Sequence, residues 1–133
     1  MPDSQGPQHL VRPDGLPPVN GYSHAVVFSG PMVVVSGQVP VDEQGRLVGE
    51  GDPAAQVRQV FENLAAALAA AGTTMDRVVK LTVFLTDLGD LAEFRRVRDQ
   101  YISAEHPPAS SLVQVSALVN PAFLVEVEAL AVT

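Results

Sequence analysis

The sequence predicts a single α+β domain with the element order β-β-α-β-α-β-β. Short runs of β-branched and aliphatic residues, bounded by glycine, proline and serine, indicate strands. Two segments between these runs carry apolar residues at helical spacing. At 133 residues the chain has the usual size of one domain. Because two helices can cover only one face of a sheet, we expect the other face to meet a second surface.

The first eighteen residues are expected to form a flexible arm, and residues 19–133 the folded domain. Several prolines lie among polar residues in this arm. Because proline fixes φ and lacks a backbone donor, no regular element is predicted there.

Residues 24–28 and 31–35 are predicted to form two strands joined as a hairpin through Ser29 and Gly30. The polar, glycine-containing segment that follows allows one short strand at residues 46–48. This hairpin would begin the sheet.

Asp52 and Pro53 predict the start of the first helix, since aspartate is a good N-cap and proline suits the first turn. Gly72 is a plausible C-terminal stop. Between them the apolar residues follow the 3.6-residue period: Val57, Val60, Phe61, Leu64, Leu68 and Ala71.

A strand is predicted at residues 78–85, which are apolar on both faces apart from one lysine and one threonine. Residues 90–93 form a capping-box pattern with aspartate as the cap. Strands at residues 111–117 and 123–132 end the domain. The second helix has one apolar side, formed by Leu91, Phe94, Val97, Tyr101 and Ile102.

Composition excludes several classes of function. The formal net charge of −7 argues against a nucleic-acid partner, because affinity for phosphates depends on lysine and arginine contacts. The chain has no cysteine, and His9, His24 and His106 lack the spacing of metal ligands. We therefore expect neither a metal nor a cofactor. Only 17% of the residues are charged, which indicates that part of the surface is buried against other subunits.

No apolar run reaches the roughly 18 residues needed to span a bilayer. The first residues lack both the basic and the apolar region of a secretory signal. We expect a cytoplasmic protein with no membrane partner.

Three segments together carry a resemblance to a known family. They are Ser36–Pro40, Pro108–Val115 and Val125–Val132, and the resemblance runs from about Tyr22 to the C-terminus. The chain resembles the RidA family, reactive intermediate deaminases also labelled YjgF or L-PSP. This resemblance implies a chorismate-mutase-like fold, a homotrimer whose sheets surround a central barrel, and active sites in the clefts between subunits.

The resemblance also assigns candidate site residues. Glu126 matches the glutamate that positions or activates the attacking water in RidA deaminases, and it is the candidate catalytic residue. From the residues alone, Glu126 and Glu128 share one strand face, and a solvated face is the alternative. A substrate-binding role is implied for Tyr22, Ser36, Gly37, Ser110 and Ser111. Tyr22 could instead anchor the arm, and Gly37 could simply avoid a clash at a strand end.

Ser110 stands where the deaminating members have an arginine that grips the substrate carboxylate. A guanidinium donates two parallel charge-assisted hydrogen bonds, whereas a serine hydroxyl makes one neutral bond. Arg95, at a position where the family usually has asparagine, could compensate and is a further candidate for substrate binding. The alternative for Arg95 is a solvated helix face.

The predicted function is binding of a small metabolite in the inter-subunit cleft, with imine deaminase activity weak or absent because of Ser110. The alternative is an enamine/imine deaminase, a hydrolase that releases ammonia. If the protein is an enzyme, we expect it to act on a small imine or a related C–N compound. A serine nucleophile would need His24 or His106 brought close by the fold. The family's older ribonuclease label fits poorly with an acidic chain.

Overall fold

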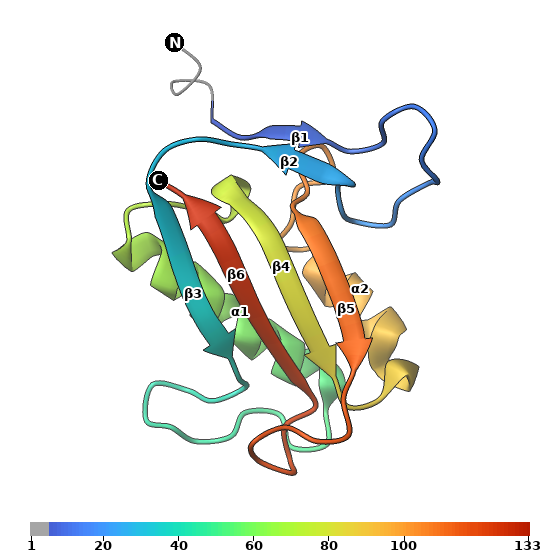
Figure 1. Cartoon of the computed structure of the whole chain (residues 1–133). Helices are drawn as coiled ribbons and strands as arrows, with labels where there is room; N and C mark the ends of the chain where they lie inside the picture. Colours follow the sequence, from blue (N-terminus) through green and yellow to red (C-terminus); the bar gives the residue numbers. More distant parts are fainter. Residues whose placement is uncertain (1–5) are drawn as a thin grey trace.

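The computed structural model describes residues 6–133. A four-stranded sheet with the order β3-β6-β4-β5 carries both helices on one face, and a two-stranded ribbon of β1 and β2 lies across one end of it (Figure 1). The α+β class predicted from the sequence is confirmed. The elements are β1 (Gln8–Leu10), β2 (Ala25–Val27), β3 (Met32–Gln38), α1 (Pro53–Ala70), β4 (Val78–Leu85), α2 (Leu91–Arg98), β5 (Ala109–Gln114) and β6 (Val125–Val132).

The last strand, β6, lies inside the sheet and pairs antiparallel with both β3 and β4. β5 joins the far side of β4 in parallel, after the crossover through α2. The predicted strand at residues 78–85 coincides with β4. This order leaves β3 and β5 at the two edges of the sheet, so residues carried on them lie far apart.

The first helix forms as predicted. The Asp52 side chain accepts a hydrogen bond from the Ala55 N–H at 3.2 Å, and Pro53 is the first helical residue. Gly72 follows the C-cap with a φ of +81°, a conformation that glycine adopts without strain. Five of the six residues of the predicted apolar stripe are buried in the core, and the sixth, Ala71, is the exposed C-cap. The buried five are Val57, Val60, Phe61, Leu64 and Leu68.

The predicted capping box of α2 is wrong in its chemistry, although the helix begins where expected. Asp90 is the N-cap residue, but its side chain makes no capping hydrogen bond. Instead Asp87 accepts from the Gly89 N–H at 2.8 Å, which closes a 3₁₀ turn just before the helix. Burial, with the neighbouring Asp87 and Glu93 carboxylates, raises the pKa of Asp90 above its ordinary value.

The predicted hairpin is also wrong, because its two strands belong to different sheets. β2 pairs antiparallel with β1, whereas β3 pairs with β6. The arm therefore holds a strand that the proline content concealed, and the prediction of no regular element fails for Gln8–Leu10. Residues 1–5 of the predicted arm lie outside the described residues, and the boundary at residue 18 stays a prediction.

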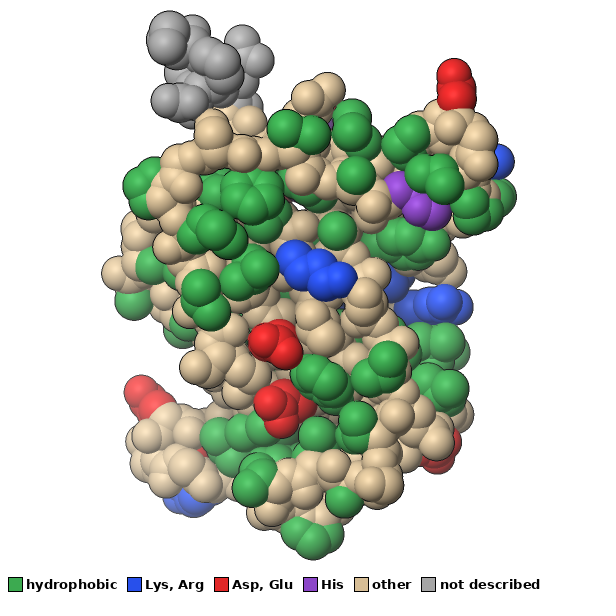
Figure 2. Space-filling view, viewed as in Figure 1, with side chains coloured by type: hydrophobic (Ala, Val, Ile, Leu, Met, Phe, Trp, Pro, Cys, Tyr) green, Lys and Arg blue, Asp and Glu red, His purple; other side chains and the backbone are tan. Residues whose placement is uncertain are grey.

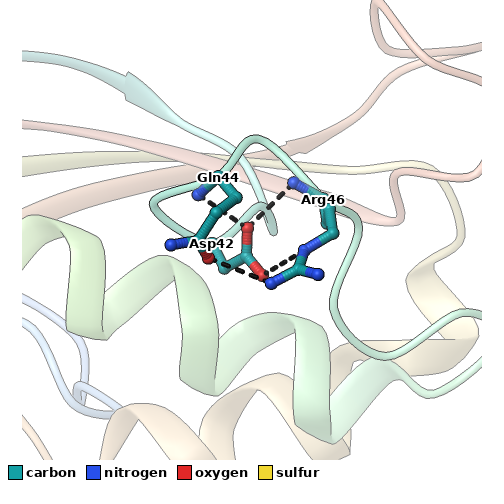
Figure 3. A network of polar contacts seen from close by, with 3 residues as sticks. All are labelled: Asp42, Gln44 and Arg46. Carbon is teal, nitrogen blue, oxygen red and sulfur yellow. Dashed lines mark hydrogen bonds and ion pairs between the residues drawn. The ribbon is translucent and has the colours of Figure 1, made fainter.

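The loop between β3 and α1 is ordered by one carboxylate (Figure 3). Asp42 Oδ1 accepts from the backbone N–H groups of Gln44 and Arg46, each at 2.9 Å, and Oδ2 lies 3.3 Å from the Arg46 guanidinium. These contacts, led by the Arg46 N–H, lower the pKa of Asp42. The strand predicted at residues 46–48 is wrong: the segment has only an isolated bridge at Leu47.

The face of the sheet opposite the helices is left open (Figure 2). On β3, Met32 and Val34 are 49% and 73% exposed. The same face carries Lys80, Glu126 and Glu128, so hydrophobic side chains surround a small charged centre. No helix within residues 6–133 is long and apolar enough to cross a membrane.

Candidate functional site

A groove of about 430 Å³ runs between α2 and β5, and we call it the α2–β5 groove. β5 forms its floor, α2 forms one wall, and the segment at residues 20–22 forms the other. It brings together three of the predicted substrate-binding residues, Tyr22, Arg95 and Ser110. The lining residues are Asn20, Tyr22, Leu88, Leu91, Phe94, Arg95, Arg98, Ser110 and Leu112.

Strand alternation places Ser110 in this groove. In the parallel pairing of β4 and β5, Ser110 lies opposite the buried Leu81, so both face the helices. Ser111 points to the open face, where its Oγ accepts a hydrogen bond from Lys80 Nζ at 2.8 Å. The structure therefore separates Ser110 from Ser111, two neighbours that the sequence assigned to one site.

The wall at residues 20–22 is held by Arg98, a residue whose role the sequence did not reveal. Its guanidinium is buried and donates to the Asn20 side-chain oxygen at 3.0 Å and to Asp99 at 2.9 and 3.0 Å. Gly21 has a φ of +72°, and a Cβ there would overlap the guanidinium. The available signal was an arginine four residues after Phe94, on the apolar side of the helix.

The three arginines of α2 differ in their partners. Arg96 is exposed and forms an ion pair with Glu93 at 2.7 Å. Arg98 is committed to Asn20 and Asp99. Within residues 6–133, Arg95 makes no hydrogen bond or ion pair, although it is partly buried against the groove. Whether Arg95 binds a ligand or is only solvated therefore stays a prediction.

Tyr22 lies on the wall of the groove and is linked to the arm through His24. Its ring meets His24 edge-on with centroids 5.5 Å apart, and His24 Nε2 lies 2.9 Å from the Pro17 carbonyl oxygen. Both interpretations of Tyr22 from the sequence are compatible with this position.

A second group of predicted residues gathers at the other edge of the sheet, and we call it the Gly37–Glu126 corner. The pairing of β3 with β6 shifts register between Val35 and Gln38. Gly37 lies in this irregularity, where a Cβ would overlap the Glu126 carboxylate. Glu126 is partly buried and makes no side-chain hydrogen bond within residues 6–133. Ser36 lies exposed beside the corner.

One chain cannot bring Ser110 and Glu126 to the same small ligand. Glu126 pairs with Phe84, which pairs with Val113, so Ser110 lies two strands away and three residues along β5. Strand spacing and rise place the two backbones about 14 Å apart. Their side chains also point to opposite faces of the sheet.

The three histidines and the possible metal ligands are placed as follows in the described part of the chain. Residues 6–133 contain no group of three or more histidine, aspartate and glutamate side chains placed to hold a metal ion. His106 stacks on His9 with ring centroids 5.6 Å apart, and His24 lies against Tyr22. Neither His24 nor His106 makes a hydrogen bond to Ser110.

The fold and its edge sites define a class of small α+β protein with solved relatives. A crystal structure from Yersinia pestis, of a protein of unknown function of the conserved Rid protein family (YyfB), matches with a TM-score of 0.90 at 33% identity. That match covers 96% of this chain and 99% of the other. The family model for Endoribonuclease L-PSP matches residues 13–133. The chain belongs to this family, the RidA/YjgF family that its sequence resembles.

Two proteins of known name are similar to this chain in sequence. Protein DfrA of Myxococcus xanthus is 44% identical over 125 residues, which cover 92% of this chain and 94% of that protein. The 2-iminobutanoate/2-iminopropanoate deaminase of Salmonella typhimurium is 40% identical over 105 residues, covering 77% and 80% of the two chains.

Proposed function

We propose that the protein binds a small metabolite in a cleft formed between copies of the chain, and that it hydrolyses imines weakly or not at all. The observation that carries this proposal is the position of Ser110. It lies on the floor of a groove large enough for a small ligand, where the family's deaminases carry an arginine.

A homotrimer supplies the surface that the open face of the sheet lacks. Both helices pack on one face, and the other exposes Met32 and Val34 together with a few charged side chains. Contiguous exposed apolar surface of this kind is typical of an interface. A ring of three copies, with the sheets around a central barrel, covers all three open faces at once.

The same assembly explains why the candidate site is divided. The α2–β5 groove lies on one edge of the sheet and the Gly37–Glu126 corner on the other. In a ring each copy offers a different edge to each neighbour, so the groove of one copy meets the corner of the next. The Arg95 guanidinium and the Glu126 carboxylate, which have no partner within residues 6–133, then lie on opposite sides of one cleft.

Weak deamination follows from the chemistry of Ser110. Losing one charge-assisted hydrogen bond of about 1.5–3 kcal/mol weakens carboxylate binding about ten- to a hundredfold. The loss of bidentate geometry also removes the orientation of the reacting carbon toward water. Glu126 remains in place, but a ligand held loosely spends little time in a reactive position.

The second candidate is imine deamination itself, and two observations favour it. A relative with 40% identity carries the name 2-iminobutanoate/2-iminopropanoate deaminase. Glu126, the candidate group for activating water, is retained beside Gly37. Cleavage of RNA is not proposed, because a chain of net charge −7 repels a phosphate backbone.

The test is a coupled assay in which an amino-acid oxidase generates 2-iminobutanoate. We expect the wild type to be at least about a hundredfold slower than an arginine-containing relative. Ser110→Arg, alone or with Arg95→Asn, should raise the rate at least about tenfold, and Glu126→Gln should remove that gain. Wild-type rates equal to those of the relative would establish the second candidate instead. A faster Ser110→Arg variant that keeps its rate with Glu126→Gln would show that the assigned cleft is wrong.

A further inference from the structure

We propose that Arg95 binds the carboxylate of a small monoanionic ligand from the α2 wall of the groove, whereas the arginine of the family's deaminases lies on the β5 floor. This inference rests on the proposed function, since it names the ligand class of the same cleft. The cation is presented by α2 instead of β5, and Ser110 on the floor becomes a neutral hydrogen-bonding partner.

The first argument is the state of the Arg95 guanidinium. Arg96 and Arg98, on the same helix, are both paired, with Glu93 and Asp99 respectively. Arg95 alone among the three has no partner within residues 6–133, and it lies against the groove. A partly desolvated cation beside apolar side chains gains most from an anion that completes its hydrogen bonds.

The second argument is the charge of the lining. The residues around the groove include two arginines and no aspartate or glutamate, in a chain of net charge −7. Asp99, which does not line the groove, forms an ion pair with Arg98 and neutralises its charge. One uncompensated positive charge therefore remains, which matches a single carboxylate better than a doubly charged phosphate.

The third argument is the body of the groove. Leu88, Leu91, Phe94 and Leu112 supply apolar surface along it, and Tyr22 closes one side. A volume of about 430 Å³ accommodates a short aliphatic or 2-oxo acid. Within residues 6–133 the Ser110 hydroxyl makes no hydrogen bond, so it can contact a ligand carbonyl or amine.

Carboxylate binding at Arg95 is consistent with weak deamination. A guanidinium on α2 holds the carboxylate at a different position from a guanidinium on β5. Moving the reacting carbon by about 1 Å can cost about a hundredfold in rate. The ligand is therefore bound, yet poorly aligned with Glu126 of the neighbouring copy.

The experiment compares 2-oxobutanoate with 2-oxobutanamide, which differ only in the carboxylate, by calorimetric or NMR titration. The wild type should bind the acid at least about tenfold more tightly than the amide. Arg95→Gln should abolish this preference and leave the affinity for the amide unchanged. Arg96→Gln is the matched control, because it removes the same charge from the same helix outside the groove. Ser110→Arg in the Arg95→Gln background should restore the preference.

Other results overturn the inference in distinguishable ways. If both probes bind equally, or if Arg95→Gln and Arg96→Gln act alike, the inference fails while the small-molecule cleft stands. If Arg95→Gln breaks the assembly in native mass spectrometry and leaves the preference in place, Arg95 is a subunit contact and the inference also fails. If neither probe binds the wild type, the proposed function and the inference fall together.

Discussion

The α2–β5 groove and the Gly37–Glu126 corner each carry one charged group without a partner in residues 6–133, but they are built differently. The groove is held by side chains, above all by the Arg98 contacts to Asn20 and Asp99. The corner is held by the backbone, through a register shift and a missing Cβ. Substitutions of side chains can change which ligand the groove binds. The corner is formed by the backbone, so the position of Glu126 depends little on neighbouring side chains.

Mixed assemblies test most directly whether the two regions meet across copies of the chain. Wild-type chains are combined with chains that carry both Ser110→Arg and Glu126→Gln. Each kind of chain alone should show little or no activity in the coupled imine assay. Random assembly gives about a quarter of the clefts both an arginine in the groove and an intact Glu126. We therefore expect about a quarter of the Ser110→Arg rate. No gain on mixing would mean that both residues act within one chain.

Gly37→Ala tests the backbone-built corner. A Cβ there overlaps the Glu126 carboxylate, which must move. In the Ser110→Arg background the imine hydrolysis rate should fall at least about tenfold. Gly45→Ala, which adds a Cβ in open space on the loop between β3 and α1, is the control and should change the rate little. An unchanged rate with Gly37→Ala would remove Glu126 from the reaction.

Arg98→Met tests the wall made of side chains. It removes the hydrogen bonds to Asn20 and Asp99 while keeping most of the buried volume. The free energy of unfolding, measured with urea, should fall by about 1–3 kcal/mol. Arg96→Met removes an exposed ion pair and should cost less than about 1 kcal/mol. Equal losses would mean that Arg98 does not hold the wall.

The smallest expected effect is a pH dependence of stability at the contact between α1 and the residues that follow α2. The Tyr101 hydroxyl, just after α2, donates to Glu62 of α1 at 2.7 Å. Burial and this contact raise the pKa of Tyr101 to about 12. Its contribution to stability is therefore present below about pH 10 and is lost between about pH 10 and 12. The stability difference between wild type and Tyr101→Phe should shrink across that window and stay flat below it.

Local signals predicted those elements whose cause is local. The spacing of apolar residues and the Asp52 cap located α1, and the bounds of β4 were predicted correctly. The hairpin failed because the partner of β2 lies upstream in a proline-rich segment, a pairing that no periodicity encodes. The capping box failed because a 3₁₀ turn at Asp87 competes for the same region.

The sequence predicted which residues belong to the candidate site, but not how these residues are arranged in space. Sequence placed Ser110 and Ser111 together, whereas strand alternation sends them to opposite faces. The sequence did not decide between a binding role and a solvated position for Arg95, because only the crossover through α2 brings this residue over β5. Arg98 was missed since its partner, Asn20, is 78 residues away in the chain.

The close packing of the Arg98 guanidinium against Gly21 also limits which residues relatives can carry at these two positions. Position 21 needs glycine twice, once for its positive φ and once for the space that the guanidinium fills. A shorter residue at position 98 relieves only the second requirement. In an alignment of relatives we expect asparagine or aspartate at position 21 to occur together with the loss of arginine at position 98. The two positions should therefore drift as a pair over evolutionary time, although 77 positions of sequence separate them.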